Sequence, residues 1–403
     1  MELLKINKVN KIENKKIQIT GSKSETNRLL ILQQLYDNLK IENPSVSDDS
    51  LVLQKALVSS ENEINISHAG TAMRFLTAYF ATQENREVIL TGSDRMKNRP
   101  IKILVDALRF LGAEIQYLEK EGYPPLKISG KKLVKDFVEI QGDVSSQYIS
   151  ALLLIAPKLP NGIKLKFKGE VTSVPYIKMT LSLLSNIGIE FDWKDNIITI
   201  LPQYAIKNKT IVVESDWSSA SYFYSLVALS PNSEIQLASY RKNSLQGDAD
   251  LFNIYKKLGV QTIFKENTII LKNANTLIPK NLELDLINTP DLAQTVAVTC
   301  FGLGISCKLT GLHTLKIKET DRLVALKTEI EKLGGKVNIT DNSIQVFSSA
   351  VINKNISIAT YHDHRMAMAF APLALKGPIQ IEDPEVVSKS YPNFWNDFEK
   401  ITQ

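Results

Sequence analysis

Cysteine is scarce in this sequence, because only Cys300 and Cys307 occur among its 403 residues. The two lie in one apolar stretch, and neither has neighbouring Cys or His residues at the spacing of a metal site. We therefore interpret both as core residues rather than as metal ligands.

Long apolar runs are also missing, since no stretch approaches the roughly 20 residues that cross a bilayer. This excludes a membrane-spanning role. The first residues show no basic segment followed by an apolar one, so we expect no secretory signal and a cytoplasmic protein. A content of 44% hydrophobic and 23% charged residues over 403 positions is typical of a globular protein, and we expect two large domains.

Tryptophan and excess charge are limited as well. A protein that binds RNA or processes its ends should carry a basic stripe with stacking aromatic side chains. Here Trp193, Trp217 and Trp395 are scattered and the net charge is only +5. These features disfavour a nucleic-acid partner, and a weakly basic chain of this size more often has a local site for an anionic ligand.

A phrase of an apolar helix, a glycine and then a strand, a polar turn and another strand recurs at intervals of roughly 75 residues. Its glycines follow the helices because glycine adopts the left-handed conformation without steric cost. The four copies contain Gly112, Gly188, Gly259 and Gly334. They predict repeated helix-plus-hairpin units.

A second phrase interleaves with the first: a short polar turn followed by an apolar helix. Its six copies lie at residues 21–24, 68–71, 143–146, 216–219, 289–291 and 362–365. The first interval is shorter than the others, so we expect six related units of which the first is abbreviated. Each start is an ordinary helix cap when taken alone, but several helix N-termini pointing into one place would bind a multiply negative ligand.

Basic residues accompany these turns. Lys23, Ser24 and Arg28 stand near one helix start, where Arg28 lies one turn after Ser24, although the spacing is not that of a nucleotide P-loop. Lys318 and Arg322 lie four residues apart and should repel each other unless an anion sits between them. Guanidinium groups bind phosphate and carboxylate by paired hydrogen bonds. The further cations beside turns are Arg74, Arg95, Arg99, Arg365 and Lys389. Individually, each of these residues is more often a surface charge or a partner at a helix end.

The order of these motifs resembles the enolpyruvyl transferases, and within them the 5-enolpyruvylshikimate-3-phosphate synthases, over nearly the whole chain. The most specific phrases are Ala69-Gly70-Thr71-Ala72-Met73-Arg74, Lys318-Glu319-Thr320-Asp321-Arg322 and Asp363-His364-Arg365-Met366-Ala367-Met368. The resemblance implies an α/β protein with the two-domain enolpyruvyl-transferase fold, an inverted α/β barrel of six βαβαββ-type repeats, three per domain. It places residues 1–20 and 215–403 in one domain and 21–214 in the other, with the active site in the cleft between them.

The resemblance also implies roles for single residues. Lys23, Asp291 and Glu319 would be catalytic, with Asp291 taking the proton of the attacking hydroxyl. The implied contacts of shikimate 3-phosphate are Lys23, Ser24, Arg28, Ser145, Ser146, Gln147, Ser173, Tyr176, Asp291, Thr314 and Lys318. Those of phosphoenolpyruvate are Lys23, Gly70, Arg99, Gln147, Arg322, Arg365 and Lys389. The implied enzyme is a monomer that uses no metal and no cofactor, and Gly70 implies a phosphoenolpyruvate pocket open to glyphosate.

Two rival interpretations stay within this resemblance. The sister enzyme that acts on UDP-N-acetylglucosamine uses a reactive cysteine in the N-proximal half, whereas both cysteines here lie near residue 300. A catalytically inactive relative is disfavoured because the acid, base and cationic residues are all present. Three positions depart from the family pattern: His68 replaces the common Asn, Thr314 stands where Asn or Ser is expected, and the segment from about 35 to 67 is short.

Overall fold

The structure is a computed structural model that describes residues 2–172 and 174–402. Internal contacts divide the chain into two compact units. Unit 1 consists of Met1–Thr20 and Glu214–Gln403, and unit 2 consists of Gly21–Val213. No helix among the described residues is long and apolar enough to cross a membrane.

Four sheets share one topology, in which two parallel strands are followed by an antiparallel hairpin. In the second repeat, β4 runs parallel to β5, while β7 runs antiparallel to β5 and to β6. Its elements are β4 (Glu63–Asn65), α3 (Gly70–Ala81), β5 (Glu87–Thr91), α4 (Asp94–Lys97), α5 (Lys102–Leu111), β6 (Glu114–Tyr117) and β7 (Leu126–Ser129). Those of the third repeat are β8 (Phe137–Gln141), α6 (Ser146–Ile155), β9 (Ile163–Lys168), α7 (Val174–Asn186), β10 (Phe191–Lys194) and β11 (Ile197–Ile200).

The fifth repeat in unit 1 has the same order, with β16 parallel to β17 and the hairpin β18–β19 beyond it. Its elements are β16 (Asn281–Asp285), η3 (Pro290–Leu292), α10 (Ala293–Leu303), β17 (Ser306–Thr310), η4 (His313–Ile317), α11 (Arg322–Lys332), β18 (Val337–Ile339) and β19 (Ile344–Val346). The left-handed glycine predicted before each hairpin is present in all four copies, from φ 114° at Gly112 to φ 83° at Gly259.

The first repeat is abbreviated, as predicted. It consists of α1 (Lys23–Leu35), β3 (Leu39–Glu42) and α2 (Asp48–Val58). Its only described sheet partner is β12 (Lys209–Val212), which pairs with β3 in parallel, and it has no outer hairpin within the described residues. The short segment between about 35 and 67 therefore lacks the hairpin that the other repeats of unit 2 possess.

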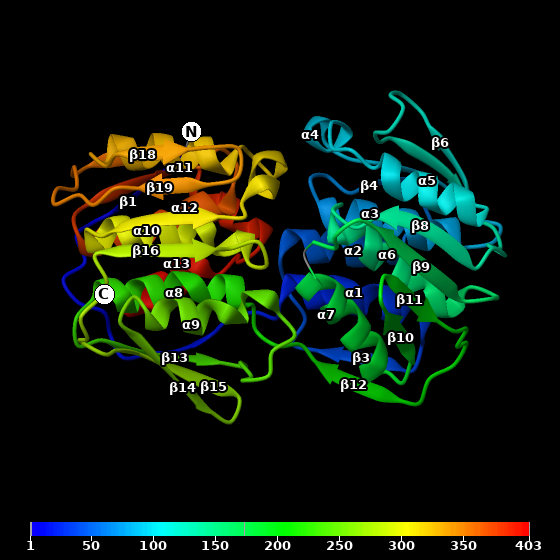
Figure 1. The fold of residues 1–403 in the computed structure, drawn as a ribbon, viewed down its shortest axis with the longest axis horizontal. Helices are drawn as coiled ribbons and strands as arrows, with labels where there is room; N and C mark the ends of the chain where they lie inside the picture. Colours follow the sequence, from blue (N-terminus) through cyan, green and yellow to red (C-terminus); the bar gives the residue numbers. More distant parts are fainter. Residues whose placement is uncertain (1, 173, 403) are drawn as a thin grey trace. The chain divides into compact units, whose positions relative to one another are not determined.

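The N-terminal strands complete sheets of the C-terminal half. Strand β2 (Lys16–Gln18) pairs in parallel with β13 (Glu234–Ala238), and β1 (Leu3–Ile6) pairs antiparallel with β21 (Ile379–Glu382). In Figure 1, the blue strand β1 accordingly lies beside the orange and red elements of unit 1. The other elements of these two repeats are α8 (Trp217–Leu229), η2 (Gly247–Asp250), α9 (Leu251–Lys256), β14 (Val260–Lys265), β15 (Thr268–Asn273), β20 (Ile356–Ile358), α12 (His364–Phe370), η5 (Ala371–Leu375), η6 (Pro384–Lys389) and α13 (Phe394–Thr402).

The first helix of each repeat forms the core. Helices α8, α10 and α12 pack against one another in unit 1, and α3 packs against α6 in unit 2. Because they are apolar on every side, these helices are buried on every side. Cys300 and Cys307 lie in the core of unit 1, as expected from the sequence. Buried helices inside, with sheets outside them, form the predicted inverted α/β barrel of six repeats, three in each unit (Figure 1).

Candidate active site

Three helix N-termini converge in unit 1. Asp216 caps α8 by accepting a hydrogen bond from Ser219 N at 2.7 Å, and Asp363 caps α12 by accepting one from Arg365 N at 2.9 Å. The Arg365 guanidinium joins these ends, since Nη2 donates to Asp291 Oδ2 at 2.9 Å and to the Ser218 hydroxyl at 3.3 Å. Asp291 lies in η3, directly before α10. The convergence predicted for several helix starts is therefore present among α8, α10 and α12.

Arg322, the first residue of α11, is the centre of a carboxylate cluster. Its side chain is only 2% exposed and donates to three carboxylates. The distances are 2.6 Å from Nε to Asp363 Oδ2, 2.9 Å from Nη1 to Asp291 Oδ1 and 2.8 Å from Nη2 to Glu319 Oε2. Paired, charge-assisted hydrogen bonds of this kind fix both proposed catalytic carboxylates on one guanidinium.

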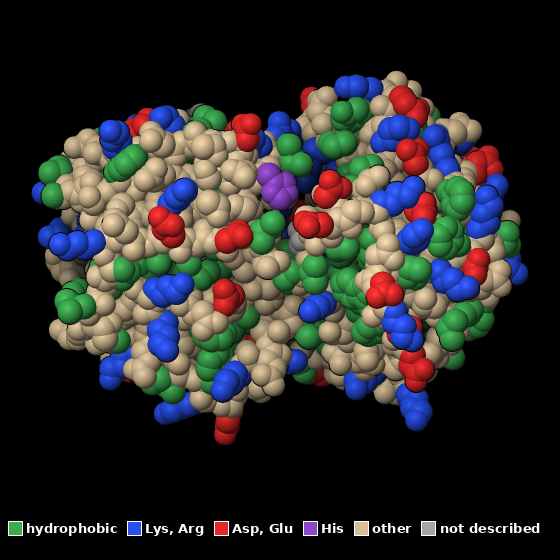
Figure 2. Space-filling view, viewed as in Figure 1, with side chains coloured by type: hydrophobic (Ala, Val, Ile, Leu, Met, Phe, Trp, Pro, Cys, Tyr) green, Lys and Arg blue, Asp and Glu red, His purple; other side chains and the backbone are tan. Residues whose placement is uncertain are grey.

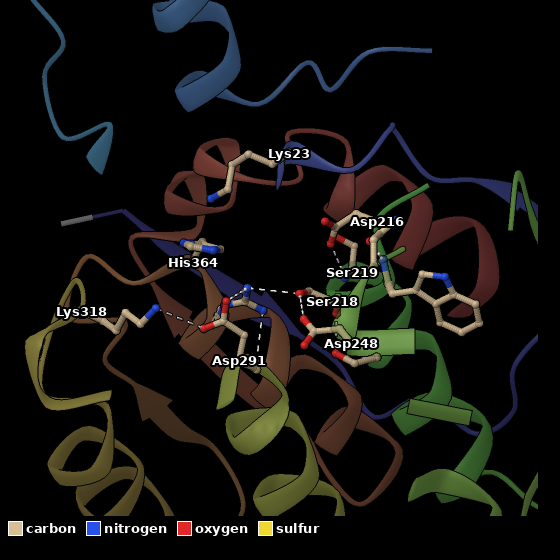
Figure 3. A network of polar contacts seen from close by, with 12 residues as sticks. Lys23, Asp216, Ser218, Ser219, Asp248, Asp291, Lys318 and His364 are labelled. Atoms are coloured by element: carbon tan, nitrogen blue, oxygen red, sulfur yellow. Dashed lines mark hydrogen bonds and ion pairs between the residues drawn. The ribbon is translucent and has the colours of Figure 1, made fainter. Parts of the chain in front are cut away.

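Two lysines complete this cluster. Lys389 Nζ lies 2.9 Å from Glu319 Oε1. Lys318 Nζ lies 3.9 Å from Asp291 Oδ1 (Figure 3). The anion that the sequence requires between Lys318 and Arg322 is thus Asp291. Asp321 also caps α11, because its Oδ1 accepts from Leu323 N and Val324 N at 3.1 and 3.2 Å. This motif therefore both caps α11 and supplies members of the charged cluster.

The cluster perturbs the titration of its own members. Burial opposes the charge of Asp291, but Arg365, Lys318 and Arg322 outweigh burial and hold the pKa of this carboxyl well below its ordinary value. Burial likewise opposes the charge of Arg322, while Asp363, Glu319 and Asp291 raise its pKa. Strongly perturbed groups that share one set of partners are typical of functional sites.

Thr314 belongs to η4, just before Lys318. Its Oγ1 is buried and has no hydrogen-bond partner among the described residues. A buried hydroxyl in this position has unused hydrogen-bonding capacity for a ligand. This observation is compatible with the ligand contact implied for Thr314 despite its departure from the family pattern.

In unit 2, Arg28 is buried and held by uncharged oxygens. Nε donates to Thr180 Oγ1 at 2.7 Å, Nη2 donates to Ser150 Oγ at 3.0 Å, and Nη1 donates to the Ser24 carbonyl at 2.8 Å. The guanidinium also lies over the Phe75 ring, with 5.5 Å between Cζ and the centroid. Burial lowers the pKa of Arg28 to about 10. The sequence placed Arg28 correctly beside Ser24 but did not predict these contacts with α6 and α7.

Lys23 and Ser24 begin α1, which Ser22 caps. Lys23 Nζ lies 3.5 Å from Asp49 Oδ2, and the Asp49 side chain is 6% exposed. Asp49 belongs to α2 and was not predicted. No local pattern could have found it, because the pairing depends on how α1 packs against α2.

Gly70 and Arg99 lie together, as do Thr71 and Gln147. A Cβ atom added to Gly70 would lie 2.4 Å from Arg99 Nη1, so only glycine leaves this guanidinium where it is. Gln147 Nε2 donates to Thr71 Oγ1 at 3.1 Å, which links the N-termini of α6 and α3. Two predicted serines lie at the same helix start as Gln147. Ser145 caps α6, and Ser146 is its first residue.

One predicted residue lies at the start of α7, and another is not described by the structure. Ser173 lies outside the described residues. Tyr176 is in the first turn of α7, and its carbonyl oxygen accepts from Arg28 Nη2 at 3.5 Å. His68, the departure before α3, has its Nδ1 3.2 Å from the Ser67 hydroxyl.

The sequence missed three further members of the cluster in unit 1. Asp363 was recognised only as part of a motif, and Ser218 only as part of a helix start. Asp248, which lies in η2 and accepts a hydrogen bond from Ser218, was not singled out. On the face drawn in Figure 2, basic and acidic side chains are interspersed over both units. No group of three or more His, Cys, Asp or Glu residues with the geometry of a metal site occurs in the part of the chain described here.

Comparison with known proteins gives a consistent result. A protein-family model described as EPSP synthase (3-phosphoshikimate 1-carboxyvinyltransferase) matches residues 52–398. A 3-phosphoshikimate 1-carboxyvinyltransferase of Bacteroides fragilis is 47% identical over 389 residues, which cover 95% of this chain and 94% of the relative. The enzyme of the same name from Haemophilus influenzae is 35% identical over 424 residues, covering 96% of each.

The fold is shared with solved structures. An EPSP synthase from Acinetobacter baumannii superposes with a TM-score of 0.77 at 21% identity, covering 98% of this chain and 97% of that one. The enolpyruvyl transferase NikO from Streptomyces tendae gives a TM-score of 0.74 at 12% identity, covering 99% and 97%. From the match over most of its length and the identity to relatives over nearly all of it, we conclude that this chain belongs to the EPSP synthase family.

Proposed function

We propose that this protein transfers the enolpyruvyl group of phosphoenolpyruvate to the 5-hydroxyl of shikimate 3-phosphate, releasing phosphate. The observation that carries the proposal is the cluster around Arg322, where Asp291 and Glu319 are held together with Lys318, Arg365 and Lys389. Two carboxylates for proton transfer, embedded among cations for phosphate and carboxylate, are what this reaction between two acidic metabolites requires.

The reaction is an addition followed by an elimination. Asp291 takes the proton of the 5-hydroxyl while the hydroxyl oxygen forms a bond to C2 of phosphoenolpyruvate. At the same time, C3 gains a proton and becomes a methyl group. The tetrahedral intermediate then loses a proton from that methyl group as the bond from C2 to the phosphate oxygen breaks. We assign the proton transfers at C3 and at the phosphate to Glu319 and Lys23. Their duties require positions within hydrogen-bond reach of the substrate.

The ligand contacts divide between the two units. In unit 1 we assign Lys318, Asp291 and Thr314 to shikimate 3-phosphate. Arg322, Arg365 and Lys389 we assign to phosphoenolpyruvate. The residues of unit 2 assigned to shikimate 3-phosphate are Lys23, Ser24, Arg28, Ser145, Ser146, Gln147, Ser173 and Tyr176, and those assigned to phosphoenolpyruvate are Lys23, Gly70, Arg99 and Gln147. We further propose that the two units close on the ligands, which would exclude water and strengthen every charge interaction.

The lowered pKa of Asp291 has a mechanistic meaning. A carboxylate surrounded by Arg365, Lys318 and Arg322 is a weak base. When the phosphate and carboxylate groups of the ligands share these cations, the stabilisation of the Asp291 anion falls and its basicity rises. We therefore propose that Asp291 becomes an effective base only when the anionic ligands are bound.

The test is phosphate release with and without shikimate 3-phosphate. We expect Asp291→Ala and Glu319→Ala each to lower turnover by about 10²–10⁴-fold, the usual contribution of a general acid or base, while circular dichroism shows a native spectrum. Rates like those of the unsubstituted protein in either variant would reject the assigned role. Phosphate release with UDP-N-acetylglucosamine in place of shikimate 3-phosphate would instead favour the sister reaction.

Other properties follow from the same proposal. We expect the protein to be cytoplasmic and monomeric. Light scattering on the purified protein would measure its mass and so test the monomer. We expect inhibition by glyphosate, because glycine at position 70 places no side chain against the Arg99 guanidinium. We also expect turnover to survive dialysis against a chelator, since cationic side chains neutralise the substrates in this scheme.

A further inference from the structure

A buried carboxylate outside the assigned ligand set lies one hydroxyl away from Arg365. Asp248, in η2, is 5% exposed, and its Oδ2 accepts a hydrogen bond from the Ser218 hydroxyl. Its Oδ1 is buried and has no hydrogen-bond partner among the described residues. Figure 3 shows Ser218 between Asp248 and the group around Asp291. A buried carboxylate with one oxygen unsatisfied costs stability and requires an explanation.

The direction of the hydrogen bonds is fixed by chemistry. Arginine can only donate, so the Ser218 oxygen accepts from Arg365 Nη2 over 3.3 Å. The single hydroxyl proton of Ser218 is then donated to Asp248. Arg365, Ser218 and Asp248 form a one-way relay in which the carboxylate orients the hydroxyl and the hydroxyl orients the guanidinium.

The turn that carries Asp248 is anchored independently of this relay. The Gln246 side chain accepts from Trp217 N and donates to the Ser215 carbonyl, both at 2.9 Å. The Ser244 hydroxyl accepts from Gln246 N at 3.0 Å. These bonds attach η2 to the start of α8, so replacing the Asp248 carboxylate should leave the turn in place.

The charged groups acting on Asp248 are Asp291, Arg365 and Asp216, together with the hydrogen bond from Ser218. Burial and then the negative charge of Asp291 raise the pKa of Asp248 to about 7, against the opposing effect of Arg365. Helix α8, which packs on η2, carries no Asp, Glu, Lys, Arg or His. A carboxyl group with a pKa of about 7 changes its charge around neutral pH.

We propose that Asp248 is a positioning residue that, through Ser218, sets the orientation and the available charge of Arg365 for phosphoenolpyruvate. The inference rests on the proposed role of Arg365. When Asp248 is protonated, Arg365 has one competing anion fewer and attracts the substrate more strongly. When Asp248 is ionised, it competes with the substrate for the same guanidinium. Binding of phosphoenolpyruvate should accordingly be accompanied by proton uptake.

The experiment compares the KM for phosphoenolpyruvate between about pH 6 and pH 8.5 in the unsubstituted protein and in Asp248→Asn. At each pH, the KM of the unsubstituted protein is divided by the KM of Asp248→Asn. This ratio cancels the effect of the ionisation of the substrate itself. We expect this ratio to rise several-fold as pH increases, because the KM of the unsubstituted protein increases when Asp248 ionises. The kcat should change little. A ratio that is constant over the pH range would overturn the proposal.

Two further variants test whether the change in KM comes from the relay. Asp397→Asn is the matched control, because Asp397 is another buried carboxylate of unit 1 that accepts from a hydroxyl, that of Tyr391 at 2.8 Å. Its KM ratio should stay constant with pH. Ser218→Ala removes the hydroxyl that donates to Asp248 and accepts from Arg365; because this hydrogen bond lowers the pKa of Asp248, its loss should move the pH dependence to higher pH. A pH dependence that stays unshifted in Ser218→Ala would also overturn the proposal.

Arg365→Lys separates this proposal from the proposed function. If Arg365 binds phosphoenolpyruvate, this variant should raise KM about tenfold or more, because lysine cannot reproduce a bidentate contact. An unchanged KM in Arg365→Lys would overturn the assigned ligand site, and with it the inference. A raised KM in Arg365→Lys together with a constant ratio for Asp248→Asn would overturn the inference alone.

Discussion

The two units hold their buried cations in opposite ways. In unit 1, Arg322 and Arg365 donate to carboxylates, and the acidic partners raise their pKa values in spite of burial. In unit 2, the hydrogen bonds of Arg28 run to hydroxyl and carbonyl oxygens, and Arg74 donates to the carbonyls of Gly70 and Pro100 at 3.0 and 2.9 Å. Burial lowers the pKa of both of these arginines to about 10.

This difference separates two tasks. A cation compensated by carboxylates keeps those carboxylates ionised and oriented, which suits proton transfer. A cation whose hydrogen bonds run to neutral dipoles has less of its positive charge compensated, which suits attraction of an anion. We infer that unit 1 supplies the proton chemistry and that unit 2 contributes chiefly to binding. Lys23, paired with Asp49, is the exception in unit 2, and it is also the residue of unit 2 to which we assign proton transfer.

The largest expected effect contrasts Arg322→Met with Arg28→Met. Removing Arg322 leaves three carboxylates without their shared partner, so we expect a loss of about 3–5 kcal/mol in the free energy of unfolding. Removing Arg28 leaves the neutral oxygens of Ser24, Ser150 and Thr180 unpaired, so we expect about 1–3 kcal/mol. Urea unfolding can report both, because Trp217 and Trp395 lie in unit 1 and Trp193 lies in unit 2.

The control for this contrast is Lys97→Met, which removes one member of an ion pair with Glu119 whose side chains are 31% and 55% exposed. Its free energy of unfolding should change by less than about 1 kcal/mol. Equal losses in Arg322→Met and Arg28→Met would break the comparison between the units.

A smaller effect should appear in acid. The pKa of Asp291 is lowered in the folded protein, so its contribution to stability is present above the ordinary pKa and is lost as pH falls through the folded value. The difference in free energy of unfolding between the unsubstituted protein and Asp291→Asn should therefore be largest above about pH 5 and shrink below about pH 4. Urea titrations at several pH values measure it. A difference that stays constant from neutral pH into acid would contradict the cation-held carboxylate of unit 1.

The smallest effect on stability is expected for Gly70→Ala in unit 2. The new Cβ would meet the flexible end of Arg99, which can move, so we expect thermal unfolding to change little. The KM for phosphoenolpyruvate should rise about tenfold, which corresponds to about 1.4 kcal/mol of binding. Arg99→Gln and the double variant complete a cycle, and the two effects should not add, because both displace the same guanidinium. Additive effects would exclude Arg99 as the cause.

The sequence predicted those parts of the structure that depend on residues close together in the chain. Gly112 and Gly334 mark helix ends because the left-handed conformation selects glycine, and Ser22, Ser145, Asp216 and Asp363 mark helix starts because they cap them. The starts of α3 and η3 were found from the same polar phrase, although neither uses a side-chain cap. The abbreviated first repeat was predicted from spacing.

The missed residues share a different property. Asp248 meets Ser218 across 30 positions, and Asp49 meets Lys23 through the packing of α2 on α1. Such partners depend on tertiary contacts that have no periodic signature in the sequence. The same reason explains Arg28, whose position on α1 was predicted but whose contacts with Ser150 and Thr180 were not.

The pairing of the N-terminal strands β1 and β2 with strands of the C-terminal half has a consequence for biosynthesis. All sheets of unit 2 are built from strands within Gly21–Val213, so this unit can close as soon as that continuous segment has left the ribosome. Strands β1 and β2 are translated before unit 2, whereas their partners β21 and β13 are translated after it. Strands β1 and β2 therefore remain without their sheet partners while unit 2 folds ahead of the unit into which it is inserted.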